Sequence, residues 1–242
     1  MWLILCHTHD APSHWLFQAL RTRGVAEVEM VSAEELLYAL RWKHLLNTSS
    51  VSVEFELNGA RTYRSSQIDG VINRIDHIDS RAWYRSTDND REYVRQELSA
   101  FFSSWLFSLP CPVYNPPDPL CLSGRVRSPA EWTVLASKAE LAGCEFYTSS
   151  REEQARITND RHAAGLLSLL VFDGKVFGQP VATAIREGCA RLASLSGCGI
   201  LGVDFHVTMG RKPTFARAST MPDLRIGGPL LVEEMAQRMG HR

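Results

Sequence analysis

The chain has 242 residues, 45% of them hydrophobic and 22% charged, which is typical of one large globular domain or two small ones. Its formal net charge is −1 and its isoelectric point is about 6.7, so binding to bulk nucleic acid is not expected. No apolar run reaches the roughly 18 residues that a membrane span needs. The opening residues, "MWLILCHTHD", also lack the basic start of a signal peptide.

Elements in the first half of the chain alternate between strands and helices. Residues 2–6 form a continuous apolar run that predicts a buried parallel strand, and apolar residues at helical spacing then continue to a glycine at position 24. Residues 25–31 alternate as a second strand, and a capping-box pair, Ser32 with Glu35, predicts a helix over 32–46. Three further elements are predicted: a hairpin over 51–65 with an Asn58-Gly59 turn, a buried strand over 69–75 and an amphipathic helix over 90–110.

Sequence patterns in the second half of the chain predict helices packed on hairpins. In chain order they are a loop-rich segment over 112–128, a helix over 129–144, an unassigned polar stretch over 146–164, a hairpin over 165–180, a helix over 181–197, a hairpin over 202–219 and a helix over 230–239. Together the two halves predict an α/β protein. Its N-terminal sheet is mainly parallel with flanking helices, and its shorter C-terminal part is α+β.

Six cysteines are scattered along the chain without any CxxC pair. They are Cys6, Cys111, Cys121, Cys144, Cys189 and Cys198. Without a secretion signal, this spacing favours reduced, buried thiols in a cytoplasmic protein.

The first predicted strand ends in "CHTHD", which offers four potential metal ligands within five positions: the Cys6 thiol, the imidazoles of His7 and His9, and the Asp10 carboxylate. A metal cluster is one interpretation. The favoured alternative is an ordinary strand-to-helix loop, in which Asp10 or Ser13 caps the following helix. In an extended chain Cys6 also points away from His7 and His9.

A charge-rich segment, "NRIDHIDSRAWYR", follows the strand over 69–75. Open α/β sheets place their ligand contacts at such strand ends. Arg74, His77 and Arg81 are therefore candidate contacts to an anionic or peptide substrate. A solvated loop of ion pairs explains the same residues equally well. Nothing in the sequence has the G-x-S-x-G pattern of a serine hydrolase.

The helix over 90–110 is apolar on more than one face. Its large apolar residues are Tyr93, Phe101, Phe102, Trp105, Leu106 and Phe107. This excess indicates burial on two sides or in an interface between copies of the chain, while simple core packing remains the commoner cause.

The hairpin over 202–219 places Asp204 on its first strand, and Arg217 and Ser219 on its return strand. Hairpins of this kind can carry carboxylates towards a metal, but a guanidinium cannot bind Mg²⁺. We expect Arg217 to pair with Asp204 or Asp223. If that pair is partly buried, Arg217→Ala costs on the order of 3 kcal/mol, whereas a solvent-facing Arg217 contributes almost nothing.

Motifs across most of the chain resemble those of ATP-grasp ligases that modify ribosomally made peptides, relatives of the glutathione-synthetase type. The motifs are "VINR" (71–74), Glu97, "LPCPVYNPP" (109–117), Ala139 to Gly143, "LLVFDGKVFG", "GVDF" and "STMPDLRIGG". The resemblance implies three segments: a pre-ATP-grasp-like domain over 1–117, a connecting helix and polar linker over 118–160, and a reduced ATP-grasp remnant over 161–242.

The same resemblance implies that the Mg²⁺ site is incomplete. Active members hold Mg²⁺ with an Asp, a Glu and an Asn, and here Asp204 matches the Asp while Arg217 and Ser219 stand in place of the Glu and Asn. The family's nucleotide subdomain, with two phosphate-binding lysines and a glycine-rich flap, would have to lie between residues 144 and 201. Lys175 is the only lysine in that interval. The resemblance therefore implies no bound cofactor or metal.

Two functions remain open. The first is a non-catalytic, ATP-grasp-like protein that binds a peptide or a partner protein, such as a complete ATP-grasp ligase, during peptide modification. The second is an enzyme: an ATP-dependent carboxylate–amine ligase completed by a partner chain, or new chemistry in the remaining cleft. Arg217 favours the first function and the retained Asp204 favours the second. The resemblance also favours a homo-oligomer, and neither nucleic acid nor membrane is an expected partner.

Overall fold

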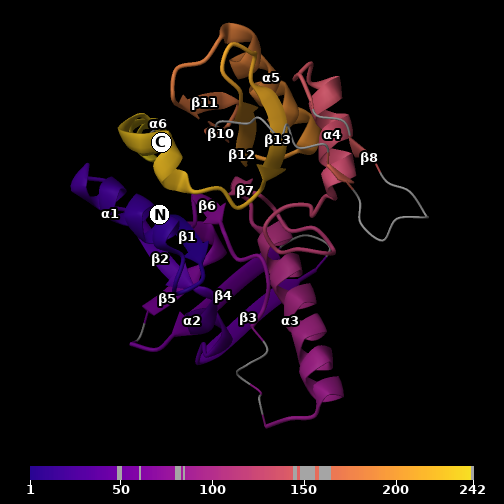
Figure 1. Ribbon diagram of the computed structural model, residues 1–242. Helices are drawn as coiled ribbons and strands as arrows, with labels where there is room; N and C mark the ends of the chain where they lie inside the picture. The colour runs from indigo at the N-terminus through magenta and orange to yellow at the C-terminus, as the bar shows by residue number, and fades with distance from the viewer. Residues whose placement is uncertain are drawn as a thin grey trace. The chain divides into compact units, whose positions relative to one another are not determined.

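The computed structural model describes residues 1–47, 51–59, 61–79, 83, 85–143, 146–147, 156–157 and 165–240. The chain forms two compact units, one comprising Met1–Arg125 with Val232–Arg242 and the other comprising Val126–Leu231. Figure 1 follows the chain through both units. Among the described residues, no helix combines the length and the apolar character needed to cross a membrane.

A four-stranded parallel sheet organises the first unit. Its strands, in spatial order, are β2 (Val28–Ser32), β1 (Trp2–Cys6), β6 (Gly70–Asn73) and β7 (Val113–Tyr114). Every residue of β1 is buried, as its continuous apolar run predicts. Helix α1 (Ala11–Thr22) connects β1 to β2. The predicted mainly parallel N-terminal sheet is confirmed.

A second sheet in this unit packs against a long helix. The antiparallel order is β3 (Arg41–Leu46), β4 (Val51–Leu57) and β5 (Arg61–Arg64), and the helix is α3 (Asp88–Ser108). The buried aromatic side chains of these elements share one core, which contains Phe55, Tyr63, Phe102 and Trp105. Figure 1 shows α3 running alongside β3 and β4.

The predicted helix over 32–46 is only partly correct. The Ser32–Glu35 capping box is present and starts α2, but this helix covers only Ala33–Leu37. After a turn over residues 38–40, the chain continues as strand β3, which pairs with β4 along its whole length. Trp42 on β3 stacks over Phe55 with 4.7 Å between ring centroids. This long-range packing outweighs the local helical pattern, since strand formation depends on cross-strand neighbours more than on intrinsic preference.

The second unit is built on an antiparallel sheet covered by helices. The sheet order is β11 (Lys175–Gly178), β10 (Gly165–Phe172), β12 (Ile200–Val207) and β13 (Thr214–Ser219). The helices that cover it are α4 (Pro129–Lys138) and α5 (Thr183–Ser196), while α6 (Gly228–Gly240) belongs to the first unit from Val232 onward. Both predicted hairpins are confirmed, including the antiparallel pairing of β12 with β13.

In this unit, one helix ends earlier than predicted, and the stretch left unassigned by the sequence contains a short strand pair. Helix α4 ends at Lys138 rather than near 144, and Glu140 adopts a left-handed φ of 60° just after the helix. The polar stretch over 146–164 lies mostly outside the described residues. Its described part is a short antiparallel pair, β8 (Phe146–Tyr147) with β9 (Arg156–Ile157).

Candidate functional site

The carboxyl ends of β1 and β6 bring two distant segments together. The strands are parallel neighbours, with Leu5 opposite Asn73, so the residues that follow each strand leave the sheet at the same edge. The segment after β1 supplies residues 7–10, and the segment after β6 supplies residues 74–77. Most of the candidate residues in the first unit therefore lie at one edge.

Arg74 forms a buried ion pair with Asp10 at this edge. Its Nε and Nη2 atoms donate to the two carboxylate oxygens at 2.7 and 3.1 Å, and the side chains are only 4% and 10% exposed. Burial opposes ionisation of Asp10, but the hydrogen bonds and charge of Arg74 hold the pKa of this carboxyl below its usual value. The guanidinium thus fixes the start of α1 to the end of β6.

The expected capping residue Asp10 is at the predicted place, but its carboxylate has a different role from the one expected. Asp10 stands at the N-cap position of α1 but makes no side-chain hydrogen bond to the helix backbone. Its carboxylate instead accepts from the Ser13 hydroxyl at 2.6 Å and from Arg74. A buried arginine competes for the same oxygens and provides a charge-assisted partner, which is stronger than a neutral amide.

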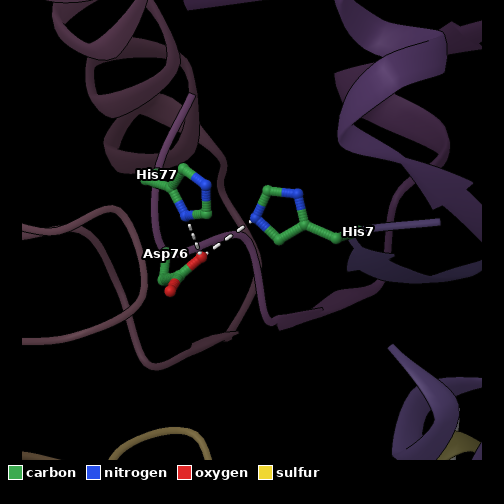
Figure 2. A group of neighbouring side chains, drawn as sticks. All are labelled: His7, Asp76 and His77. Atoms are coloured by element: carbon green, nitrogen blue, oxygen red, sulfur yellow. Dashed lines mark hydrogen bonds and ion pairs between the residues drawn. The ribbon is translucent and has the colours of Figure 1, made fainter. Parts of the chain in front are cut away.

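A second cluster joins His7 to Asp76 and His77. Asp76 Oδ1 accepts from His7 Nε2 at 2.9 Å and from His77 Nδ1 at 2.7 Å, as Figure 2 shows. The hydrogen bond from His7, together with that from His77, holds the pKa of Asp76 well below its usual value. The same hydrogen bond raises the pKa of His7.

Only one member of "CHTHD" enters that cluster. The Cys6 side chain is buried in the sheet, and burial raises the pKa of its thiol to about 12, which leaves it neutral. His9 is exposed and lies outside the group formed by His7, Asp76 and His77. Arg81 falls outside the described residues, so its place relative to His77 is not described.

A cavity of about 530 Å³ adjoins the cluster within the first unit. Asp76 and His77 line one part of it, and α3 contributes Arg95, Gln96 and Ser99. Cys121 lines the cavity as well, and its thiol lies 3.5 Å from the Asp76 carbonyl oxygen. The cavity is large enough for a small ligand or a peptide side chain.

The hairpin β12–β13 carries the candidate residues of the second unit. Asp204 lies opposite Arg217, and Gly202 lies opposite Ser219, with a bulge between Asp204 and Phe205. Arg217 Nε donates to Asp204 Oδ2 at 2.7 Å. The predicted pair is therefore confirmed with Asp204, whereas the carboxylate of Asp223 accepts from Arg225 instead.

Arg217 of this pair lines a cavity of about 440 Å³. Arg217 and His206 from the hairpin line it together with Trp132 from α4 and Leu166 from β10. Arg127 also lines the cavity, and its guanidinium lies 5.1 Å from the centroid of the Trp132 ring. The cavity thus combines cationic side chains with an apolar wall.

Arg217→Ala is expected to change stability by less than about 1 kcal/mol, because pairs open to water are weak. Arg217 is 71% exposed while Asp204 is only 18% exposed, so water rehydrates the carboxylate once the arginine is removed. Only the Asp204 half of the pair is partly buried, and the Arg217 half is open to water, so we expect the smaller of the two losses considered above. Urea unfolding of the variant at neutral pH checks the prediction, and a loss near 3 kcal/mol would show that Asp204 is poorly solvated.

The sequence predicts most of these residues but in two separate groups. It places His7 in "CHTHD" and His77 in a loop after a later strand, whereas the structure brings both to Asp76. The signal that links them is that both histidines follow buried strands. When two such strands are parallel neighbours, their carboxyl ends meet at one edge of the sheet, which predicts the contact.

Comparison with known proteins gives likenesses in structure but not in sequence. No protein-family model matches the chain, and no curated protein matches its sequence. Among solved structures, the macrocyclase MdnC bound with precursor peptide MdnA, from Microcystis aeruginosa, is similar with a TM-score of 0.74 at 10% identity, covering 98% of each chain. The macrocyclase MdnB of the same organism has a TM-score of 0.69 at 14% identity, again over 98% of each chain.

A third similar structure comes from a different organism. It is a RiPP-associated ATP-grasp ligase of Chryseobacterium gregarium in complex with ADP and a leader and core peptide, with a TM-score of 0.71 at 11% identity. The match covers 100% of this chain and 97% of that one. At these identities the comparison establishes the fold. The α/β class and the resemblance to peptide-modifying ATP-grasp ligases are therefore confirmed at the level of the fold.

Proposed function

We propose that this protein is a non-catalytic ATP-grasp-like protein that binds a peptide, or a partner protein carrying one, during peptide modification. The observation that carries the proposal is the ion pair between Arg217 and Asp204. Asp204 matches the Asp that binds Mg²⁺ in the ligases that this sequence resembles. Here its carboxylate accepts a hydrogen bond from Arg217 instead.

The chemistry of this pair opposes a magnesium–nucleotide site. Mg²⁺ needs several hard oxygen ligands that it shares with phosphate groups. The Arg217 guanidinium offers only donors and carries a fixed positive charge that repels the ion. Ser219 does not restore the ligand set, because its hydroxyl oxygen accepts a hydrogen bond from the Met221 backbone N–H at 3.1 Å. One carboxylate, already paired, is a poor substitute for three ligands.

The lysine content of the second unit supports the same proposal. Lys175 is the only lysine between residues 144 and 201, and it stands at the exposed start of β11, directly after the Asp173-Gly174 turn. Two cationic groups converging on phosphates are expected in the resembled ligases. A single lysine in a tight hairpin turn cannot supply both of them.

Peptide binding is supported by the neighbours and by the exposed charge of Arg217. Two of the similar structures contain a precursor peptide or a leader and core peptide. Arg217 keeps donors available to solvent beside the cavity that Trp132 and Leu166 line. A peptide carboxylate pairing with Arg217, with an apolar side chain in the cavity, fits this combination.

Isothermal titration calorimetry of the full chain with Mg-ATP tests the non-catalytic part, and we expect no measurable heat of binding. A dissociation constant in the micromolar range would contradict the proposal.

The double variant Arg217→Glu, Ser219→Asn restores the ligand types of an active hairpin. We expect it to show no ATP hydrolysis, because phosphate-binding lysines are still missing. Turnover by this variant would show that the rest of the nucleotide site is intact.

Titration with the precursor peptide from the same gene neighbourhood tests the peptide part. We expect binding that weakens when Arg217 is replaced by Ala and persists when the exposed Arg211, on the turn of the same hairpin, is replaced. Equal binding by both variants would remove Arg217 from the peptide site. A complete ATP-grasp ligase encoded alongside is the natural partner to include in a second titration.

A further inference from the structure

We propose that His7, Asp76 and His77 form a binding site for a divalent transition-metal ion of the Zn²⁺ type. The site lies at the carboxyl ends of β1 and β6 in the first unit. It is separate in sequence and chemistry from the hairpin that carries Asp204 and Arg217. The inference therefore does not depend on the proposed function.

The three side chains already converge on one point. His7 Nε2 and His77 Nδ1 both contact the same oxygen of Asp76, at 2.9 and 2.7 Å, and Figure 2 shows the two rings approaching that oxygen from different sides. All three ligand atoms lie within 4.8 Å of one another. Ligands bound to a tetrahedral ion at Zn²⁺ distances are about 3.4 Å apart, so only a small opening of the cluster is needed.

The ligand types select the class of metal. Two imidazoles and one carboxylate suit Zn²⁺, Co²⁺, Ni²⁺ or Fe²⁺, whereas Mg²⁺ and Ca²⁺ prefer sites made of oxygen alone. Among the described residues the group contains no cysteine: Cys6 is buried in the sheet, and Cys121 lines the adjoining cavity without belonging to the group, so a softer ion is not favoured. Zn²⁺ is the suitable probe.

A carboxylate behind His7 supplies the support that metal-binding histidines usually have. His7 Nδ1 lies 3.6 Å from Glu34 Oε1, on the side of the ring opposite to Asp76. Glu34 is itself held by Thr8, whose backbone N–H and hydroxyl donate to Glu34 Oε2 at 3.1 and 2.8 Å. Glu34 thus stands beside the ring nitrogen remote from Asp76, the position from which a carboxylate orients a metal-bound histidine with Nε2 directed at the ion.

The environment leaves room for further ligands. The His77 side chain is 61% exposed, and Asp76 and His77 line the cavity of about 530 Å³ described above. A bound ion would have three protein ligands and at least one position open to water or to a ligand group in the cavity. Three protein ligands with an open position are typical of reactive rather than structural zinc sites.

Calorimetric titration of the metal-free full chain with ZnCl₂ tests the proposal. We expect one ion per chain, with binding weakened by at least about tenfold in His77→Ala and in Asp76→Ala. Glu34→Gln should weaken binding by about tenfold as well, because it loosens His7 without removing a ligand. His9→Ala is the matched control, since His9 is exposed on the same loop but lies outside the cluster. It should bind Zn²⁺ like the parent chain.

Two results would overturn the proposal. One is the absence of binding tighter than the millimolar range. The other is equal binding by the parent chain, His77→Ala and His9→Ala, which would place the ion elsewhere. Co²⁺ gives an independent readout, because its visible absorption bands gain intensity in a site of low coordination number. Those bands should appear with the parent chain and be lost in His77→Ala, an exposed substitution that leaves the folded protein intact for comparison.

Discussion

Arg74→Ala is expected to lower the free energy of unfolding by about 3–5 kcal/mol at neutral pH, because it leaves a buried carboxylate without its charged partner. Asp10 is only 10% exposed, and the guanidinium of Arg74 contacts both of its oxygens. After the substitution only the Ser13 hydroxyl remains among its described side-chain partners. Urea unfolding followed by far-ultraviolet circular dichroism measures the loss.

A matched control separates burial from charge. Arg64 also pairs with an acidic residue, Glu54, but its side chain is 54% exposed. Arg64→Ala should therefore cost less than about 1 kcal/mol. If Arg74→Ala and Arg64→Ala unfold at the same urea concentration, the Arg74–Asp10 pair does not contribute as a buried pair.

The effect of Arg74→Ala should also depend on pH. Because the pKa of Asp10 is lowered in the folded chain, its ionisation stabilises the fold above the unfolded value of about 3.9, and this contribution is lost as the pH falls through the lower folded value. The parent chain loses this stabilisation in acid, whereas the variant never has it. The difference in unfolding free energy between them should shrink below about pH 4. A difference that stays constant from pH 7 to pH 3 would exclude Asp10 as the stranded group.

This pair gives Arg74 a positioning role beside the proposed metal site. Sequence patterns predicted Arg74 as a contact to substrate, and the structure places its guanidinium on Asp10, at the end of the loop that carries His7. Its backbone N–H also donates to the Leu5 carbonyl at 2.7 Å, which ties the two strand ends together. Loss of the side chain is thus expected to loosen the loop on which His7 is held.

The sequence predicts contacts between residues that are close along the chain better than contacts between distant ones. The Asp204–Arg217 pair was predicted because both residues belong to one hairpin, whose turn and alternation determine which side chains face each other. The His7–Asp76 contact joins residues 69 positions apart, and it depends on which strands are neighbours in the sheet. Alternation along a single strand carries no information about that order.

Strand β3 also depends on contacts between residues that are distant in sequence, so its secondary structure was not predictable from the local pattern. Residues 32–46 begin with a capping box and continue with leucines at helical spacing, so the local pattern predicts one helix. The chain leaves the helix after Leu37 because Trp42 packs against aromatic residues of β4 and α3 that are distant in sequence. The apolar excess predicted for α3 has the same explanation: part of it contacts β3 and β4.

Trp105→Ala is expected to lower the free energy of unfolding by about 3–5 kcal/mol, because it removes the largest fully buried side chain of that aromatic core. The indole is 0% exposed, and its ring lies 5.1 Å from Trp42 and 5.3 Å from Phe55. The substitution opens a cavity between α3 and the sheet β3-β4-β5. Guanidinium unfolding followed by circular dichroism measures the loss.

Trp105→Phe distinguishes packing from hydrogen bonding. The indole Nε1 of Trp105 has no hydrogen-bond partner among the described residues, so the N–H adds a desolvation penalty rather than a bond. Phenylalanine keeps an aromatic ring in the cluster and removes that penalty. We therefore expect a loss of only about 1–2 kcal/mol, set by the smaller ring. A loss as large as that of Trp105→Ala would show that the indole N–H is bonded in solution.

Phe107→Ala is the matched control on the same helix. Phe107 is 63% exposed, so its removal should change the unfolding free energy by no more than about 0.5 kcal/mol in a monomer. If α3 instead packs against a second copy of the chain, Phe107→Ala should shift the unfolding midpoint at high protein concentration and leave it unchanged at low concentration. The two substitutions thus separate the two expectations for the apolar surface of α3: burial in the core at Trp105, and burial between copies at Phe107.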